Sequence, residues 1–326
     1  MKKILITGGA GFIGSNFIHH LLENREYEIV NLDKLTYAGN LENLRDVEKH
    51  PRYKFAQGDI ADTRFLEQLF EKEQFDGVIN FAAETHVDRS IEDSSPFVQT
   101  NIVGTHALLE VARAYKIKRY HQVSTDEAYG DLGDNSSDYF TEKTPINPNC
   151  PYAAAKASAD LLVLSWHETY GLDAIITRCS NNYGPYQFPE KLIPFFLFRA
   201  MSDQDLPLYG DGKNIRDWLY VRDHCEAILT AFEKSDPGEV WNIGGHNEKT
   251  NIEIAELILQ HVPNSKSKIT FIEDRKAHDR RYAMDASKIE KQLGWKPTHT
   301  FEQALPKTIQ WYLQNREWVE QCHQKA

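Results

Sequence analysis

The sequence predicts an α/β protein built on a Rossmann-type, doubly wound parallel sheet, followed by a smaller C-terminal α/β domain. Apolar runs typical of buried strands alternate with segments of helical periodicity over the first half of the chain. The first strand runs into the turn Gly8-Gly9-Ala10-Gly11-Phe12-Ile13-Gly14, and the next strand ends in Asp33. The 326 residues are 41% hydrophobic and 26% charged, as is ordinary for a globular chain of one or two domains.

Composition argues against several classes of protein. A net charge of -11 disfavours a nucleic-acid surface, which needs a basic face. No apolar run approaches the length of a membrane span, and the first strand begins too early to leave room for a signal peptide. The four cysteines are scattered, so we expect a cytoplasmic protein with neither a disulfide framework nor a metal site. They are Cys150, Cys179, Cys225 and Cys322.

The first strand, turn and helix predict a phosphate-binding site. Gly8 or Gly9 permits the tight turn, Gly11 lets a pyrophosphate approach the backbone, and Gly14 lets the helix pack closely on the strand. The free N–H groups of the helix then point at the anion. The alternative is a glycine-rich turn of an α/β core that binds no ligand.

The second strand, Ile29 to Asp33, ends in a carboxylate that can accept hydrogen bonds from an adenosine ribose. An acid there would repel a 2'-phosphate, which favours NAD over NADP. The polar loop Lys34 to Asn40 is expected beside the adenosine. Further strands are predicted at Tyr53 to Asp59, Gly77 to Phe81, Arg119 to Ser124 and Leu172 to Ser180, and helices at Asp62 to Glu73, Pro96 to Tyr115 and Tyr152 to Tyr170.

Ligands of such a sheet bind at the carboxyl ends of its strands, where two further segments carry reactive side chains. After Phe81, two alanines leave space and His86 follows; it can be a general base, but a structural role is favoured. The run Ser124-Thr125-Asp126-Glu127 places two hydroxyls and two carboxylates where a strand opens into a loop. Adjacent carboxylates usually form a solvated turn, but this position favours a catalytic role.

Tyr152 and Lys156 lie one turn apart on the predicted helix that follows Pro151. A nearby lysine and a positively charged nicotinamide both favour the phenolate, so the pair can act as a base at neutral pH. Such a pair also occurs often by chance. Together with the dinucleotide turn and the Ser124-Thr125 hydroxyls, it predicts a hydride-transfer site.

The remaining chain mixes helices with short strands and polar loops and is expected to form a smaller lobe. Its loops carry Lys191, Arg216 and the run His278 to Tyr282, whose cations can hold a second diphosphate or can form ordinary surface ion pairs. We expect a boundary after residue 185, with residues 1–185 and 186–326 as the two domains and about 215–245 returning to the first. Helices are predicted at Leu192 to Met201, Val221 to Phe232, Asn251 to His261 and Phe301 to Val319.

These residues together resemble the extended short-chain dehydrogenase/reductases that act on nucleotide sugars, and among them the 4,6-dehydratases. The resemblance covers nearly the whole chain. It departs at Ala128, Ala153, Ala155 and Thr85, none of which removes a reacting group, although Thr85 adds a methyl where substrate is expected. The most similar segments are Ser124 to Gly130, Cys179 to Tyr186, Phe188 to Pro194, Arg216 to Val221 and Asn242 to Gly245.

The resemblance implies an NAD-dependent lyase that converts dTDP-glucose into dTDP-4-keto-6-deoxyglucose and water, in deoxysugar biosynthesis such as that of dTDP-rhamnose. Tyr152, helped by Thr125 and Lys156, is expected to take the proton of the sugar's 4-hydroxyl while hydride passes to NAD. Glu127 then removes the C5 proton, and Asp126, held protonated by its neighbours, donates to the departing 6-hydroxyl. Hydride returns to C6 and a proton to C5, so the cofactor is regenerated.

The same resemblance assigns the binding residues. Contacts with NAD are expected from Gly8, Gly11, Phe12, Ile13, Gly14, Asp33, Lys34, Leu35, Thr36, Gly39, Asp59, Ile60, Phe81, Ala82, Ala83, Thr85, Asn101, Ser124, Tyr152 and Lys156. Contacts with the nucleotide sugar are expected from Thr85, Thr125, Asn181, Lys191, Leu192, Pro207, Tyr209, Arg216, Asn251, Asp279, Arg280, Arg281 and Tyr282.

Three alternatives stay open, and the first is another nucleotide-sugar 4,6-dehydratase. A nucleotide-sugar 4-epimerase or decarboxylase would share the scaffold, but an epimerase needs no acid and base for water loss, so Asp126 and Glu127 argue against it. A catalytically inactive NAD-binding regulatory protein would have no use for those two residues together with Tyr152 and Lys156. In the resembled family the two long helices of the first domain form a dimer interface; here they are apolar on more sides than a sheet-facing helix needs, so we expect a homodimer.

Overall fold

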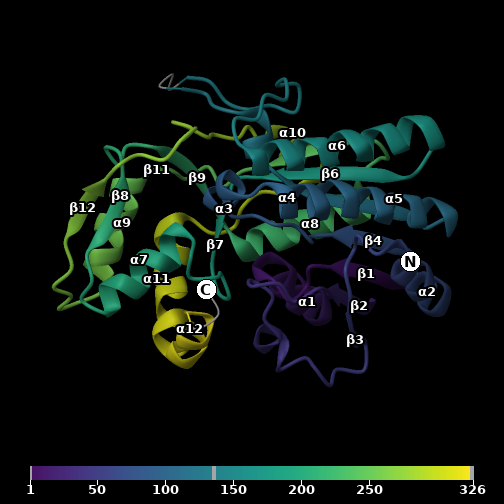
Figure 1. The fold of residues 1–326 in the computed structure, drawn as a ribbon, viewed down its shortest axis with the longest axis horizontal. Coiled ribbons are helices and arrows are strands. Elements are labelled where there is room, and N and C mark those ends of the chain that lie inside the picture. The colour runs from purple at the N-terminus through teal and green to yellow at the C-terminus, as the bar shows by residue number, and fades with distance from the viewer. Residues whose placement is uncertain (1, 134–136, 324–326) are drawn as a thin grey trace.

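A seven-stranded parallel sheet forms the centre of the molecule (Figure 1). The computed structural model describes residues 2–133 and 137–323. The strand order is β10-β6-β5-β4-β1-β2-β3, which is the doubly wound order and confirms the predicted fold class. The strands are β1 (Lys3–Thr7), β2 (Glu28–Asp33), β3 (Tyr53–Gln57), β4 (Gly77–Asn80), β5 (Arg119–Thr125), β6 (Ala174–Cys179) and β10 (Val240–Ile243).

Alternate residues of each strand point to opposite faces, so the sheet is covered on both sides. In β1, Ile4 and Ile6 pack into the cluster under α1 (Phe12–Asn24) and α8 (Val221–Lys234). Leu5 packs into the cluster of the other face. That face is covered by α2 (Thr63–Glu73), α5 (Thr105–Ala114) and α6 (Pro151–Tyr170) (Figure 1). Burying each such aliphatic side chain contributes about 1.5–3 kcal/mol.

Two predicted helices differ from those observed. The segment predicted as one helix from Pro96 to Tyr115 is α4 (Ser95–Phe97), the π-helical turn η2 (Val98–Gly104) and α5 in succession. The segment predicted from Phe301 to Val319 is wrong as a single helix. It is α11 (Phe301–Gln314) and α12 (Arg316–His323), separated by Asn315, whose side chain donates to the Trp311 carbonyl at 2.7 Å. That local hydrogen bond competes with helix continuation and leaves the apolar periodicity unchanged.

The C-terminal lobe has its own core, built around α7 (Leu192–Met201), α9 (Asn251–His261) and α11. A mixed three-stranded sheet joins β7 (Asn181–Tyr183), β9 (Ile215–Tyr220) and β11 (Glu248–Thr250), and a two-stranded sheet joins β8 (Leu206–Tyr209) and β12 (Ile269–Ile272). The remaining elements are η1 (Leu41–Leu44), α3 (Val87–Glu92), η3 (Asp126–Tyr129) and α10 (Ser287–Leu293).

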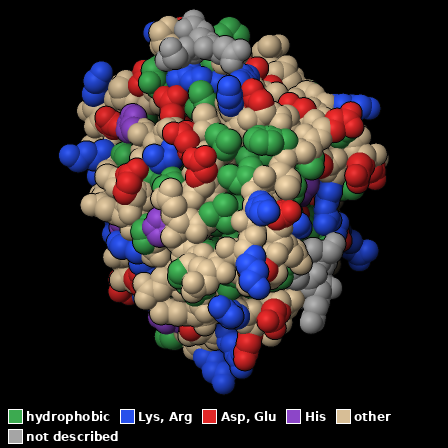
Figure 2. Space-filling view, turned by 90° about the vertical axis from the view of Figure 1, so that its left-hand side faces the viewer, with side chains coloured by type: hydrophobic (Ala, Val, Ile, Leu, Met, Phe, Trp, Pro, Cys, Tyr) green, Lys and Arg blue, Asp and Glu red, His purple; other side chains and the backbone are tan. Residues whose placement is uncertain are grey.

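The surface of this lobe carries charges of both signs. On the face shown in Figure 2, Asp and Glu side chains lie among Lys and Arg side chains, around a group of hydrophobic ones. Within the described residues, every helix is too short or too polar to cross a membrane.

Candidate active site

A cavity of about 290 Å³ lies at the carboxyl edge of the sheet. Its lining extends to the start of the C-terminal lobe, at Gln187, Phe188, Glu190 and Lys191. Of the residues predicted to contact NAD, all except Leu35 and Asn101 line this cavity. Asp126, Glu127 and four of the predicted sugar contacts, Thr85, Thr125, Asn181 and Lys191, line it as well. The lining residues that sequence reasoning missed are Leu32, Ala38, Gly58, Glu84, Thr100, Val123, Cys179, Ser180, Asn182, Gln187, Phe188 and Glu190.

The glycine-rich turn leaves no space for side chains where it meets the sheet. Gly8 has a φ of +68°, and a Cβ there would lie 2.6 Å from the backbone nitrogen of Ala82. A Cβ on Gly14 would lie 2.4 Å from the carbonyl oxygen of Gly8. In the described chain no side chain caps the start of α1 at Gly11. This close backbone turn before uncapped helical N–H groups fits the diphosphate of a dinucleotide.

Asp33 holds the turn and the following loop together. Its Oδ2 accepts from the Ala10 N–H at 2.9 Å, and its Oδ1 accepts from the Leu35 N–H at 2.8 Å. Each carboxylate oxygen keeps further lone pairs, so the group can still accept from ribose hydroxyls in the cavity. Leu35 therefore contributes its backbone here, and Lys34 pairs with Asp59 at 2.7 Å on the cavity wall.

Asn101 acts on the cavity wall through the backbone. Its side chain accepts from the Glu84 N–H at 2.9 Å and donates to the Glu84 carbonyl at 3.0 Å. These bonds position the segment after β4, while the neighbouring Thr100 lines the cavity. Sequence reasoning placed Asn101 in direct contact with NAD; the structure places it behind Glu84.

Asp126 is a buried carboxyl with one unpartnered oxygen. Its side chain is 2% exposed; Oδ1 accepts from the Thr125 hydroxyl at 3.2 Å, and Oδ2 has no hydrogen-bond partner among the described residues. Burial raises its pKa well above the ordinary value, and the negative charges of Glu127 and Asp217 raise it further. The protonated form is therefore favoured, and it can donate a proton.

Glu127 is adjacent in sequence but lies among cations. It is partly exposed, and burial raises its pKa while the positive charges of Arg275, Lys191 and Arg216 oppose that rise. The two neighbouring carboxyls thus stand in different environments. Asp126 is held as an acid, and Glu127 has the stronger tendency to ionise, which is the arrangement of a general acid beside a general base.

Tyr152 and Lys156 both lie on the cavity side of α6. The ammonium of Lys156 donates to the Val123 carbonyl at 2.7 Å, and burial lowers its pKa against the attraction of Asp160. Burial raises the pKa of Tyr152 well above its ordinary value; Glu127 adds to this rise, and a hydrogen bond with Thr125 opposes it. The protein's own charges thus favour the neutral phenol, so the expected phenolate requires an additional positive charge such as an oxidised nicotinamide.

Ser124 lines the cavity but its hydroxyl turns toward α6. It donates to Asp160 Oδ2 at 3.0 Å, and that oxygen also accepts from Arg178 Nε at 2.8 Å. Both members of the ion pair are buried. A buried, hydrogen-bonded ion pair therefore supports the strand end that carries Thr125 and Asp126.

Three of the predicted sugar contacts form a group near Glu127. The guanidinium of Arg216 lies 4.2 Å from the centre of the Tyr282 ring and donates to the Asp279 carbonyl at 2.9 Å. The Tyr282 hydroxyl donates to the Asp279 carboxylate. Burial raises the pKa of Tyr282 well above its ordinary value, and the negative charge of Glu127 raises it further, so the Tyr282 hydroxyl lies within electrostatic range of Glu127.

Other predicted sugar contacts lie outside the cavity lining. Leu192 begins α7, Pro207 and Tyr209 lie on β8, and the Asn251 N–H donates to the Asn214 carbonyl at 3.0 Å. Arg280 pairs with Asp211 at 2.8 Å. Arg281 pairs with Glu248 at 2.7 Å and donates to the Asp138 carbonyl at 2.6 Å.

His86 has a structural position. Its Nδ1 accepts from the Arg89 N–H at 3.4 Å as the N-cap of α3, and its Nε2 lies 3.6 Å from Glu190 Oε2. It does not line the cavity. Among residues 2–133 and 137–323, no group of three or more His, Cys, Asp and Glu side chains is arranged to hold a metal ion.

Two neighbours of the site, Arg275 and Glu190, were assigned no role from the sequence. Arg275 is the first of the cations that oppose the rise in the pKa of Glu127, and Glu190 lines the cavity beside Lys191. Arg275 belongs to no periodic segment or motif, whereas Glu190 lies in the segment Phe188 to Pro194, which resembles the dehydratases. Only the packing of the two lobes brings them to the site.

The chain matches a family model described as GDP-mannose 4,6 dehydratase over residues 5–308. It is 52% identical to dTDP-glucose 4,6-dehydratase of Neisseria meningitidis serogroup B, covering 98% of this chain and 95% of that one. The structure is similar to dTDP-glucose 4,6-dehydratase of Bacillus anthracis in complex with NAD, with a TM-score of 0.92, 49% identity and coverage of 99% and 100%.

It is also similar to dTDP-glucose 4,6-dehydratase of Streptomyces venezuelae with NAD and TYD bound. That TM-score is 0.94 at 45% identity, and the match covers 98% of this chain and 99% of the other. These matches span both lobes and include the cavity. The chain therefore belongs to the dTDP-glucose 4,6-dehydratase family.

Proposed function

We propose that the protein converts dTDP-glucose into dTDP-4-keto-6-deoxyglucose and water with bound NAD. The observation that carries this proposal is the pair Asp126 and Glu127, because one is buried with an unpartnered oxygen and the other lies among three cations. Membership of the family and the dinucleotide-shaped turn support the choice of cofactor. When bound, NAD accepts hydride from C4 of the sugar and returns it to C6.

Each reacting side chain then has one task. Tyr152 takes the proton of the 4-hydroxyl, with Thr125 hydrogen-bonded to it and Lys156 one turn along α6 on the same cavity wall. Glu127 removes the C5 proton, which the new 4-ketone has made acidic. Asp126 donates its proton to the departing 6-hydroxyl, so that water leaves. When hydride returns to C6, the protonated Glu127 gives the proton back to C5. A sugar epimerase would need no such donor.

Purified protein supplied with dTDP-glucose should form a base-sensitive 4-keto sugar with no net gain of reduced cofactor. Failure to form that product in the presence of NAD would contradict the assignment. A panel of dTDP-, UDP-, GDP- and CDP-sugars, with identification of the products, tests base selectivity and separates dehydration from epimerisation.

A second test concerns the division of labour between the carboxyls. Glu127→Gln should still transfer hydride to the cofactor in a single turnover, because Tyr152 and Lys156 are intact, but it should halt elimination. Formation of reduced cofactor without loss of water is the expected result. Dehydration at the parent rate would exclude Glu127 as the C5 base.

Four further assignments complete the proposal. The predicted binding residues act as assigned, with Arg216, Asp279 and Tyr282 nearest the reacting end. The four scattered cysteines fit a reducing cytoplasm, and the product enters dTDP-rhamnose synthesis. The chain divides at residues 1–185 and 186–326, and the pairing of β10 with β6 supports the return of about 215–245 to the first domain.

The protein is also proposed to form a homodimer through η2, α5 and α6. Val98, Val103, Leu161 and Tyr170 are large hydrophobic side chains of these helices or of their ends, and all four are exposed. Covering them with a second copy would bury apolar surface that is otherwise in water. Sedimentation should give the dimer mass, and a monomer at all concentrations would contradict it.

A further inference from the structure

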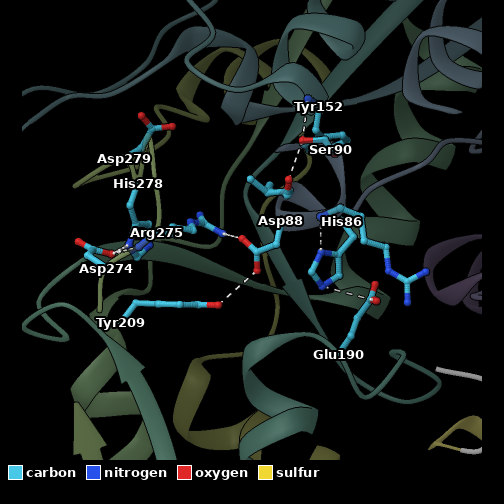
Figure 3. Close-up of polar contacts among 12 residues, drawn as sticks. His86, Asp88, Ser90, Tyr152, Glu190, Tyr209, Asp274, Arg275, His278 and Asp279 are labelled. Atoms are coloured by element: carbon cyan, nitrogen blue, oxygen red, sulfur yellow. Dashed lines mark hydrogen bonds and ion pairs between the residues drawn. The ribbon is translucent and has the colours of Figure 1, made fainter. Parts of the chain in front are cut away.

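The short helix α3 contacts the start of α6 through Ser90 and the C-terminal lobe through Asp88, as the labelled side chains of Figure 3 show. The N-cap of α3 and two residues of the helix make polar contacts in different directions. His86 faces Glu190, Asp88 faces Arg275 and Tyr209, and Ser90 faces the backbone of Tyr152. No task in the proposed reaction uses any of these three residues.

At the catalytic end, Ser90 satisfies an N–H group that α6 cannot satisfy by itself. The N-cap Cys150 makes no side-chain cap hydrogen bond, and the next residue is Pro151. The Tyr152 N–H donates to Ser90 Oγ at 3.3 Å, and that hydroxyl donates onward to the Val87 carbonyl at 2.6 Å. Ser90 is 1% exposed, so no water replaces it at this helix start.

At the other end, Asp88 reaches the C-terminal lobe. Its Oδ1 lies 3.6 Å from Arg275, and its Oδ2 accepts from the Tyr209 hydroxyl at 3.5 Å. Figure 3 shows both residues reaching toward Asp88 from the same side. Arg275 in turn is the leading cation that lowers the pKa of Glu127. The helix α3 therefore connects Arg275, one of the charges around Glu127, with the backbone N–H of Tyr152.

We propose that α3 is a positioning element which fixes Tyr152 through Ser90 and links that position to the C-terminal lobe through Asp88. The inference rests on the proposed function, because it assigns Tyr152 the role of the 4-hydroxyl base. A hydrogen bond to the backbone at the start of α6 restrains the Cα of Tyr152 and hence the reach of its phenol. Proton transfer depends steeply on such placement.

The kinetic test is a double-mutant cycle on dTDP-glucose turnover. Ser90→Ala should lower kcat about tenfold and leave KM within about twofold, because Ser90 acts on Tyr152 and not on the sugar. Asp88→Asn should lower kcat about threefold. If the two residues act as one element, the double variant loses about tenfold and not the product of about thirtyfold. Full multiplicative loss would overturn the link.

Amide hydrogen exchange tests the same element without turnover. In the free protein, peptides that cover the first turn of α6 should exchange faster in Ser90→Ala, and to a smaller degree in Asp88→Asn. Unchanged exchange in both variants would overturn the proposal. Because this measurement needs no substrate, it separates a failure of this inference from a failure of the proposed reaction.

Matched controls are available on the same two helices. Ser158→Ala removes an exposed hydroxyl that bonds within α6, to the Ala154 carbonyl at 2.8 Å, and Glu92→Gln removes an exposed charge of α3. Both should keep the parent kcat and exchange. Should Ser90→Ala fold poorly, Ser90→Cys keeps the volume with a weaker acceptor, and its kcat should fall between those of parent and alanine variant. Parent kcat in a folded alanine variant would exclude a positioning role.

Discussion

The sheet lobe and the C-terminal lobe use their polar residues differently. At the edge of the sheet, predicted residues from separate strands converge on one cavity, and Asp126 keeps an oxygen free to react there. In the C-terminal lobe, Arg280 and Arg281 pair with Asp211 and Glu248 of the same lobe. A polar or charged residue in the sequence therefore indicates a binding or catalytic site where the fold brings such residues together in one cavity. It is weak evidence for a site where an oppositely charged side chain lies nearby and can form an ion pair with it.

Parallel topology explains the difference. In the sheet lobe the carboxyl ends of all strands lie on one edge, so residues that are far apart in sequence lie close together there. The short strands β7, β9 and β11 join in mixed orientation, so the ends of the antiparallel strands β9 and β11 lie at opposite edges of their sheet. In a chain with a net charge of -11, carboxylates are plentiful partners for arginines in the loops of the C-terminal lobe.

The largest expected effect is at the base in the sheet lobe. Tyr152→Phe should lower kcat by about a thousandfold, within the usual range for loss of general acid–base catalysis. The removed hydroxyl serves the first proton transfer, so reduced cofactor should also fail to appear in a single turnover. Steady-state and single-turnover assays check this. The matched control, Tyr170→Phe at the exposed end of α6, should retain parent activity.

Glycine-to-alanine substitutions in the two lobes should differ in how much unfolding free energy they cost. Gly14→Ala should cost about 3 kcal/mol of unfolding free energy and most of the NAD affinity, since its Cβ would lie 2.4 Å from the Gly8 carbonyl oxygen. Gly212→Ala in the C-terminal lobe has a φ of +69° and meets only side chains, at 3.0 Å or more. It should cost about 1 kcal/mol and leave NAD affinity unchanged. Urea unfolding and NAD titration measure both; equal losses would refute the distinction.

Acid should destabilise the sheet lobe through two buried histidines. Burial lowers the pKa of His121 on β5 and of His224 on α8 to about 3. In the unfolded chain each histidine has a pKa of ~6.5, so below that pH the unfolded state binds more protons than the folded state. The stability that the two neutral histidines contribute is therefore fully present above pH ~6.5, and it is lost as the pH falls toward 3, by ~1.4 kcal/mol per pH unit for each histidine.

The free energy of unfolding should therefore drop between pH 7 and pH 5. His224→Gln should remove one of the two titrating groups and so about half of the acid slope that the pair produces. The exposed His106→Gln is the control, and its slope should match the parent. An unaltered slope in the His224 variant would exclude that residue as a source of the acid sensitivity.

The smallest expected effects are on KM, and they distinguish a cation that lines the cavity from one that lies outside the cavity lining. Lys191 lines the cavity and donates to the Thr85 carbonyl at 2.9 Å, so Lys191→Gln should raise KM for dTDP-glucose about tenfold. Arg280 pairs with Asp211 outside the cavity lining, and Arg280→Gln should change KM by less than about threefold. Initial-rate kinetics give both values. A larger effect on KM at Arg280 than at Lys191 would contradict this ranking.

Much of the sheet lobe followed from sequence because its determinants are local. The apolar runs predicted the strands, and the apolar spacing predicted a helix from Asp62 to Glu73; in the structure Asp62 is the N-cap of α2, which begins at Thr63. Gly8 and Gly14 lie against backbone, as the motif requires. By contrast, Asn315 ends α11 through a side-chain bond that leaves the hydrophobic period intact, so periodicity alone extended the helix past it.

The sequence by itself determined the fold class, the dinucleotide turn and the presence of two adjacent carboxyls at a strand end, because periodicity and glycine spacing act over short stretches of chain. The family resemblance assigned Asp126 as the acid and Glu127 as the base, but only the tertiary structure supplies the physical difference between them. Their immediate chemistry is the same, and the difference comes from burial, from Asp217 and from Arg275, Lys191 and Arg216. Electrostatic energy depends on distance in space, which residue order does not specify.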